Sequence, residues 1–467
     1  MNGKAHIFWE RYHHLRGKSQ RFIRFVALAW QWWLISAAVF AVRLVVDFCL
    51  NPRISVTKVL IALTLLGEIA ALLREYAGKR HALSQLEFCR IDPRELARLS
   101  FRLNESYRSS CYDILNCHGL YVLYSPVINR RLPANSLAFK KKGQLRKSRI
   151  FLTIAPAVLL KSLQESSIVF KEAKVRLCTD LTNETFEHGI VYLQKTDYLA
   201  SSCTNEITLT KVVSKELGCE IFNGVRNIGR ITNDCAQPAY HVFTLQESPC
   251  SNHIGISTLA ITKDGRIILT KQSPKKAQSP GLLAPSGSGS ANWSDLKHTK
   301  DSLNRFLQNA MVRELQEELG FKHFKYQQLR TIIIGFARIL NRRGKPEFFG
   351  VTFLDTPAAL GKVSARERVF TEGFEEINIP ITETDWQALA TAEPKIDEEL
   401  KQEITRGINI FIAENRVRLS PSLYLNLLFL KEWLRGTGHT ADELPENPME
   451  CSSLYRAKSE GEKLCEG

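Results

Sequence analysis

The sequence predicts a mixed α/β fold, an α/β/α sandwich in which helices cover both faces of one sheet. Three observations carry this prediction. Residues 254–272 read as a strand, a tight Asp-Gly turn and a second strand. Residues 303–319 show the apolar spacing of a helix, and 329–354 return to strand-like composition. An amphipathic helix over 423–435 is suited to packing on the resulting sheet.

The 467 residues allow two or three domains. We expect a transmembrane helical hairpin, a connector, a β-rich region, the α/β sandwich and a disordered tail. These segments are 1–80 (hairpin with basic flanks), 81–164 (helical and loop-like connector), 165–245 (a small β-rich domain or an extension of the later sheet), 246–438 (sandwich) and 439–467 (tail).

The N-terminal segment carries two apolar runs, 25–46 and 59–73. A membrane-spanning helix needs about 20 mostly apolar residues, which the first run reaches and the second approaches. Basic residues flank the pair, so the positive-inside rule predicts a two-pass hairpin with both termini in the cytoplasm. Arg43 and Glu68 interrupt the runs. We expect them to pair with each other within the bilayer or to mark a helix–helix contact on homo-oligomerisation. The alternative is a buried helical hairpin in a soluble domain.

Charge and cysteine usage favour an intracellular body. The net charge is +15, and part of it lies in the basic run 140–149, which is typical of a solvated linker or a contact with anionic lipid headgroups. No motif supports nucleic-acid binding. The 11 cysteines are scattered without a CxxC pair, so we expect reduced thiols and no disulfide framework or zinc site.

The helix over 303–319 ends in a cluster of acids. Glu314, Glu317 and Glu318 stand at i, i+3 and i+4, which places them on one helix face. At about 100° per residue they fall within about 60° of Leu303, so they continue the apolar stripe. Burying unpaired carboxylates costs several kcal/mol each, and a hard divalent cation would compensate for it. The alternative is a solvated acidic face.

These residues resemble a known motif. Arg313 to Phe321 is similar to the second half of the Nudix box, Arg-Glu-hydrophobic-x-Glu-Glu-x-Gly-hydrophobic. The resemblance implies a hydrolase that cleaves a pyrophosphate bond in a nucleoside diphosphate derivative with Mg²⁺ or Mn²⁺. It implies Glu314, Glu317 and Glu318 as metal ligands and Arg313, Glu317 and Glu318 as the catalytic set, with Arg313 orienting its neighbours.

The first half of the box departs from the family pattern. Thr299 and Arg305 stand where the family has glycine and glutamate, and Asp301 is a weak substitute for that acid. A glycine-containing segment lies further upstream, displaced by an insertion that includes Asn292, Trp293, Ser294 and Asp295. We expect substrate binding there, at Ser286, Gly287 and Gly289.

Two acids further along the chain are candidates for an additional carboxylate, because the family often takes one from a later loop or strand. These are Glu372 and Glu375, and a solvated acidic loop is the competing interpretation.

The sequence thus favours a membrane-anchored Nudix-type pyrophosphohydrolase that acts on a nucleotide-type small molecule. A catalytically weak nucleotide-sensing module that controls the membrane hairpin is the alternative from a different class. A soluble multidomain protein is the third.

Overall fold

The computed structural model describes most of the chain between residues 85 and 436. The described residues are 85–117, 119–164, 173–229, 231–232, 238–274, 279–320, 329–355 and 371–436, with isolated helical residues at 42, 46, 64, 67, 71 and 74. Apart from these isolated positions, the expected transmembrane hairpin lies outside the described residues, as does the expected tail 439–467. In the part of the chain that the structure describes, no helix combines the length and the apolar character needed to cross a membrane.

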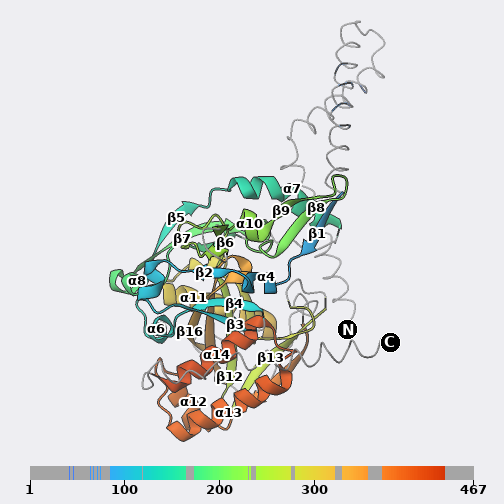
Figure 1. Cartoon of the computed structure of the whole chain (residues 1–467). Helices are drawn as coiled ribbons and strands as arrows, with labels where there is room; N and C mark the ends of the chain where they lie inside the picture. The colour runs from blue at the N-terminus through green and yellow to red at the C-terminus, as the bar shows by residue number, and fades with distance from the viewer. Residues whose placement is uncertain are drawn as a thin grey trace.

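A nine-stranded mixed sheet forms the centre of the molecule (Figure 1). Its strand order is β14-β13-β12-β17-β16-β4-β3, with β15 paired to β12 and β18 paired to β13. The strands are β3 (Asp113–Cys117), β4 (Leu120–Tyr124), β12 (Gly255–Thr262), β13 (Arg266–Gln272), β14 (Leu283–Ala284), β15 (Gly287–Ser290), β16 (Leu329–Ile339), β17 (Lys345–Leu354) and β18 (Thr371–Asn378).

Helices cover both faces of this sheet. Helix α11 (Leu303–Leu319) packs on one face, against β12, β15 and β16. Helix α14 (Pro421–Arg435) packs on the other face, and α13 (Glu398–Asn415) packs against α14. The short helix α12 (Glu383–Leu389) lies in the same C-terminal part. The mixed α/β class is therefore confirmed, and so is the layering of helices on both faces.

Local sequence signals explain where these helices begin and end. The Ser302 side chain caps α11 by accepting a hydrogen bond from the Arg305 backbone N–H. Gly320 ends the helix in the left-handed region, at φ 75°, which a glycine adopts without steric cost. Ser420 caps α14, whose first position is Pro421, where proline fits because that N–H has no helical partner.

The connector was expected to be helical and loop-like, and this is wrong for its secondary structure. Residues 86–144 contain five strands, and the hairpin β3–β4 joins the edge of the central sheet beside β16. Short segments of this kind show weak periodicity, so their strand state depends on pairing with distant residues. The domain boundaries themselves stay predictions.

The N-terminal half builds three further sheets, each of three strands: β1-β8-β9, β10-β11-β2 and β5-β7-β6. Their strands are β1 (Leu86–Arg90), β2 (Ser100–Arg102), β5 (Ala138–Gln144), β6 (Ala173–Leu177), β7 (Ile190–Asp197), β8 (Thr210–Ser214), β9 (Cys219–Asn223), β10 (Ile231–Thr232) and β11 (Ala239–His241). The helices are α4 (Arg94–Ala97), α5 (Glu105–Ser109), α6 (Pro126–Arg131), α7 (Arg149–Gln164), α8 (Asn183–His188), α9 (Tyr198–Ser202) and α10 (Gly224–Asn227).

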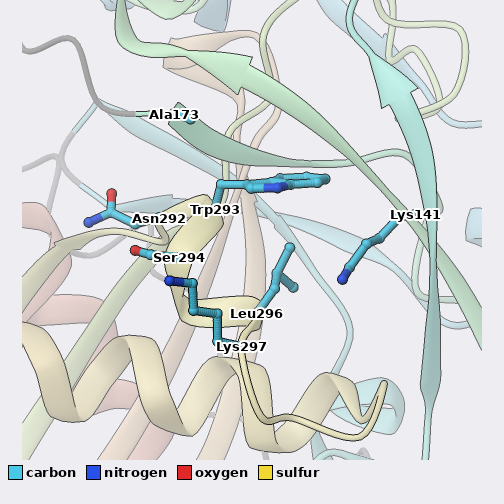
Figure 2. A pocket seen from close by; sticks show the side chains of 7 residues that line it. All are labelled: Lys141, Ala173, Asn292, Trp293, Ser294, Leu296 and Lys297. Carbon is cyan, nitrogen blue, oxygen red and sulfur yellow. The ribbon is translucent and has the colours of Figure 1, made fainter.

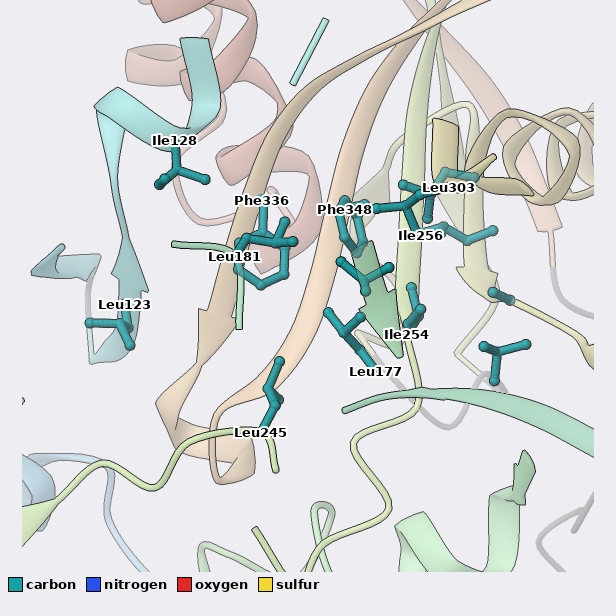
Figure 3. Close-up of a cluster of buried hydrophobic side chains, with 14 of the residues drawn as sticks. Leu123, Ile128, Leu177, Leu181, Leu245, Ile254, Ile256, Leu303, Phe336 and Phe348 are labelled. Atoms are coloured by element: carbon teal, nitrogen blue, oxygen red, sulfur yellow. The ribbon is translucent and has the colours of Figure 1, made fainter. Parts of the chain in front are cut away.

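One buried cluster joins the two halves. Leu177 of β6 and Leu123 of β4 belong to the same core as Ile256, Leu303 and Phe348 of the sandwich (Figure 3). The described strands of 165–245 pair within the three small sheets and not with the central sheet. The shared core packs two of these sheets, β5-β7-β6 and β10-β11-β2, on the sandwich. It also holds the segment that follows β15 between sheet β5-β7-β6 and α11, where the candidate site lies.

Candidate functional site

The acidic end of α11 is only partly buried. Glu318 is 3% exposed, whereas Glu314 and Glu317 are partly exposed. The prediction that all three acids continue the buried stripe was therefore wrong for two of them. The stripe runs through Val312, Leu315 and Leu319 in the last turns, because the packing partners of the helix change along its length.

Arg313 is held by an acid that lies far upstream in the sequence. Its Nε donates to Asp295 Oδ1 at 2.9 Å, and its Nη2 donates to Asp295 Oδ2 at 3.0 Å. The Asn292 backbone N–H also donates to Asp295 Oδ2, at 2.8 Å. The pair is bidentate and buried on the aspartate side, a geometry that fixes the guanidinium plane.

The same guanidinium faces the acids of its own helix. Nη1 lies 2.8 Å from Glu314 Oε1 and 3.7 Å from Glu317 Oε1. Burial alone would lower the pKa of Arg313, but Glu314, Asp295 and Glu317 outweigh it and raise that pKa above its ordinary value. Arg313 therefore stays cationic and balances a concentrated negative charge, as an orienting residue would.

Strand β15 approaches α11 closely at two glycines. A Cβ atom at Gly287 would lie 2.7 Å from the Leu315 backbone nitrogen. A Cβ atom at Gly289 would lie 2.3 Å from Glu314 Oε1. Both contacts are shorter than van der Waals distance, so the glycines set how the acidic helix meets the sheet.

The expected glycine loop is thus a strand, and its residues take different roles from those predicted. Ser286 is fully buried, accepts from the Ala260 N–H at 2.6 Å and donates to the Ile268 carbonyl, so its side chain joins β12 to β13. The Ser288 N–H donates to Glu318 Oε2 at 3.2 Å. Gly289 is exposed beside Glu314. Of the three predicted substrate-binding residues, only Gly289 is on the surface.

The two unorthodox box positions lie away from Arg313. Thr299 is buried and its hydroxyl donates to the Leu296 carbonyl at 3.0 Å. Arg305 and Asp301 are exposed. The acid that faces Arg313 is Asp295 and not Asp301. An Asn-x-x-Asp capping pattern at 292–295 was the sequence signal that could have found it.

The candidate additional carboxylates, Glu372 and Glu375, lie on strand β18. Glu375 shares a face with Ile377, which packs in the α13–α14 core, and it pairs with Arg418. Glu372 pairs with Lys271 at 2.9 Å, and Lys271 alternates onto that same face. Neither candidate is therefore directed toward α11, and the solvated-loop interpretation is replaced by a paired strand.

The donor set on α11 fits a hard divalent cation, since Glu314, Glu317 and Glu318 offer carboxylate oxygens. In the structure, Arg313 engages Glu314 and the Ser288 N–H engages Glu318. Across the described ranges, no group of three or more His, Cys, Asp or Glu side chains is gathered as a metal site. Binding of Mg²⁺ or Mn²⁺ would thus require these carboxylates to turn toward the ion.

A hollow of about 470 Å³ opens beside this site, against the short helix η1 (Trp293–Leu296). Its described lining residues are Lys141, Ala173, Asn292, Trp293, Ser294, Leu296 and Lys297. Figure 2 shows the Trp293 ring and the Leu296 side chain together, with Lys141 extending toward them from β5.

Comparison with solved structures finds Nudix hydrolases among the neighbours. The MutT Nudix hydrolase of Burkholderia pseudomallei is 21% identical, with 31% of this chain and 98% of that chain covered and a TM-score of 0.19. A bifunctional NMN adenylyltransferase/ADP ribose pyrophosphatase of Francisella tularensis, in complex with AMP and a Mn ion, is 16% identical (35% and 41% covered, TM-score 0.20).

DR0079 of Deinococcus radiodurans is 14% identical, with 39% of this chain and 83% of that chain covered and a TM-score of 0.24. The match to the Francisella enzyme spans 41% of the length of that enzyme. No family model and no curated protein matches the sequence. At these identities and TM-scores, none of the likenesses assigns a function to the chain.

Proposed function

We propose that this protein is a Nudix-type pyrophosphohydrolase that cleaves a nucleoside diphosphate derivative. The observation that carries the proposal is the acidic end of α11, where Arg313, locked by Asp295, faces Glu314 and Glu317 while Glu318 is buried against β15. This arrangement concentrates carboxylates on a rigid helix, and the box-like sequence from Arg313 to Phe321 lies on it.

Each residue has a role that follows from its contacts. Asp295 fixes the guanidinium of Arg313, and Arg313 in turn orients Glu314 and Glu317. The Ser288 N–H orients Glu318, and burial shields the Glu318 carboxylate from solvent. The absence of a side chain at Gly289 lets the Glu314 carboxylate lie directly against β15.

Glu314, Glu317 and Glu318 would hold the divalent ion. When bound, such an ion neutralises phosphate charge and lowers the pKa of a coordinated water. The protein's own contribution is to hold the carboxylates on one rigid surface and to balance their mutual repulsion with Arg313.

The proposal is tested by measuring phosphate-bond hydrolysis of a panel of nucleoside diphosphate derivatives with Mg²⁺. We expect activity in the wild type and a loss of at least about a hundredfold in Glu318→Gln, a change that keeps the side-chain shape. Glu414→Gln, at an exposed position on α13, is the matched control. Equal activity of wild type and Glu318→Gln on every substrate would contradict the proposal.

Two observations favour a second candidate, a nucleotide sensor without turnover. Arg305 stands where the box has glutamate, and the Glu314 carboxylate is already engaged by Arg313. A sensor would bind a nucleotide tightly and leave it intact. Ligand-dependent oligomerisation or membrane leakage, measured with the full chain, would identify it.

Membrane anchoring by residues 1–80 is part of the proposal and rests on the two apolar runs and their basic flanks. We expect the full chain to sediment with membranes after a high-salt wash and to be released by detergent. Recovery in the soluble fraction without detergent would contradict the anchor and leave the hydrolase proposal intact.

A further inference from the structure

The hollow beside η1 combines an aromatic face with positive charge. Trp293 is half-buried, and two of the described lining residues, Lys141 and Lys297, are exposed lysines. No acidic side chain is among the described lining residues. A flat ring with ammonium groups beside it suits a ligand that carries both a planar ring and a phosphate.

The walls of the hollow are held in place by the protein. The buried Lys174 donates from Nζ to Asn292 Oδ1 at 2.5 Å, which ties the start of η1 to β6. At its other end, Asp295 is bonded to the Asn292 N–H and to Arg313. Trp293 therefore lies on a segment that is fixed on two sides, so its ring is available as a preformed surface.

The two lysines come from different parts of the chain. Lys141 lies on β5, where it shares a face with the buried Phe139, and its Nζ lies 5.9 Å from the centre of that ring. Lys297 directly follows η1. The volume of about 470 Å³ falls within the range of roughly 300–1,000 Å³ that is usual for small-molecule sites.

We propose that this hollow binds a nucleotide, with the base stacked on Trp293 and a phosphate paired with Lys141. The Asp295–Arg313 pair links the wall of the hollow to the acidic end of α11, which makes the bound nucleotide the nucleoside half of the substrate. That last assignment rests on the proposed function, whereas nucleotide binding at the hollow does not.

The test measures binding of ADP to the full chain by calorimetry, in EDTA so that no hydrolysis occurs. We expect Trp293→Ala to weaken ADP binding about fivefold or more, since base stacking on an aromatic side chain contributes at least that much. Trp293→Phe keeps an aromatic ring and the packing, and should retain binding within about threefold. Lys141→Ala should weaken ADP binding but leave adenosine binding unchanged.

Lys140→Ala is the matched control, because Lys140 neighbours Lys141 on β5 but alternates onto the opposite face. Inorganic pyrophosphate, which has no ring, separates an anion site from a nucleotide site, and its binding should not depend on Trp293. The proposal is overturned if wild type does not bind ADP. It is also overturned if Trp293→Phe binds as poorly as Trp293→Ala, or if Lys140→Ala weakens ADP binding as much as Lys141→Ala.

The outcomes also separate this proposal from the hydrolase. Hydrolysis that is lost in Glu318→Gln but unchanged in Trp293→Ala and Lys141→Ala would leave the enzyme standing and remove the assignment of the hollow to the nucleoside half of the substrate. ADP binding that depends on Trp293 in a protein without hydrolytic activity would keep the nucleotide site and remove the hydrolase.

Discussion

Asp295 and Arg313 form a bidentate ion pair that joins the segment after β15 to the acidic end of α11, with donor–acceptor distances of 2.9 and 3.0 Å. The pair is 18 residues apart in sequence. It fixes the guanidinium that balances Glu314 and Glu317, so the charge of the site depends on a residue outside the box-like motif.

The first prediction concerns this pair. We expect Asp295→Asn to lower hydrolysis about tenfold or more, because the neutral amide weakens the pairing and releases Arg313 from its position. The free energy of unfolding should fall by about 1–3 kcal/mol, as for a weakened buried hydrogen-bonded charge. Asp301→Asn, an exposed acid of the same segment, should change neither quantity. Equal effects of the two substitutions would contradict the role of Asp295.

The second prediction separates stability from function at the two glycines of β15. Gly287→Ala places Cβ against the Leu315 backbone, which cannot move away, so we expect a loss of about 1–3 kcal/mol in unfolding free energy. Gly289→Ala places Cβ against the Glu314 carboxylate, which can rotate. It should leave thermal stability nearly unchanged while it lowers activity and metal affinity. Thermal melts and activity assays on both variants check this, and an inverted pattern would contradict the packing.

The third prediction is a pH dependence of stability at Glu432. Burial raises the pKa of Glu432 from its ordinary value of 4.5 to about 7, despite nearby Arg435 and Arg130, and its Oε2 has no hydrogen-bond partner. The folded state therefore favours the protonated acid. Its contribution to stability is full below pH 4.5 and is lost as the pH rises through 7.

Glu432→Gln mimics the protonated form, so it should match wild type at pH 4.5. At pH 8 it should be more stable by about 1–3 kcal/mol, less than the full linkage because the residue is partly exposed. Denaturant unfolding at both pH values checks this. Glu414→Gln, an exposed position, should show no such difference between the two pH values. Equal stability of Glu432→Gln and wild type at pH 8 would contradict the burial of this acid.

The regular elements of the sandwich could be predicted from the sequence. Strands β12 and β13 lie within the expected region 254–272, and β16 and β17 begin and end the expected region 329–354. These strands are strongly apolar and bounded by turn residues, so their own composition determines them. The helical range 303–319 was likewise predicted, from its apolar spacing.

The rest depends on contacts between distant residues. The hairpin β3–β4 is stable as part of the sheet only because it pairs with β16, which lies more than 200 residues later. Asp295 reaches Arg313 only because the segment 291–302 folds back onto α11. The periodicity of the sequence does not predict such a fold-back. The burial of Glu318 but not of Glu317 likewise depends on how β15 crosses the helix.

The proposed function requires that the acidic end of α11 binds a divalent cation. Titration of the full chain with Mn²⁺, followed by electron paramagnetic resonance, tests it with a readout separate from activity. We expect binding in the wild type and a loss of affinity of about tenfold or more in Glu317→Gln, which removes a partly exposed carboxylate without disturbing the core. Mn²⁺ binding of equal affinity in Glu317→Gln and wild type, or no binding in wild type, would contradict the claim.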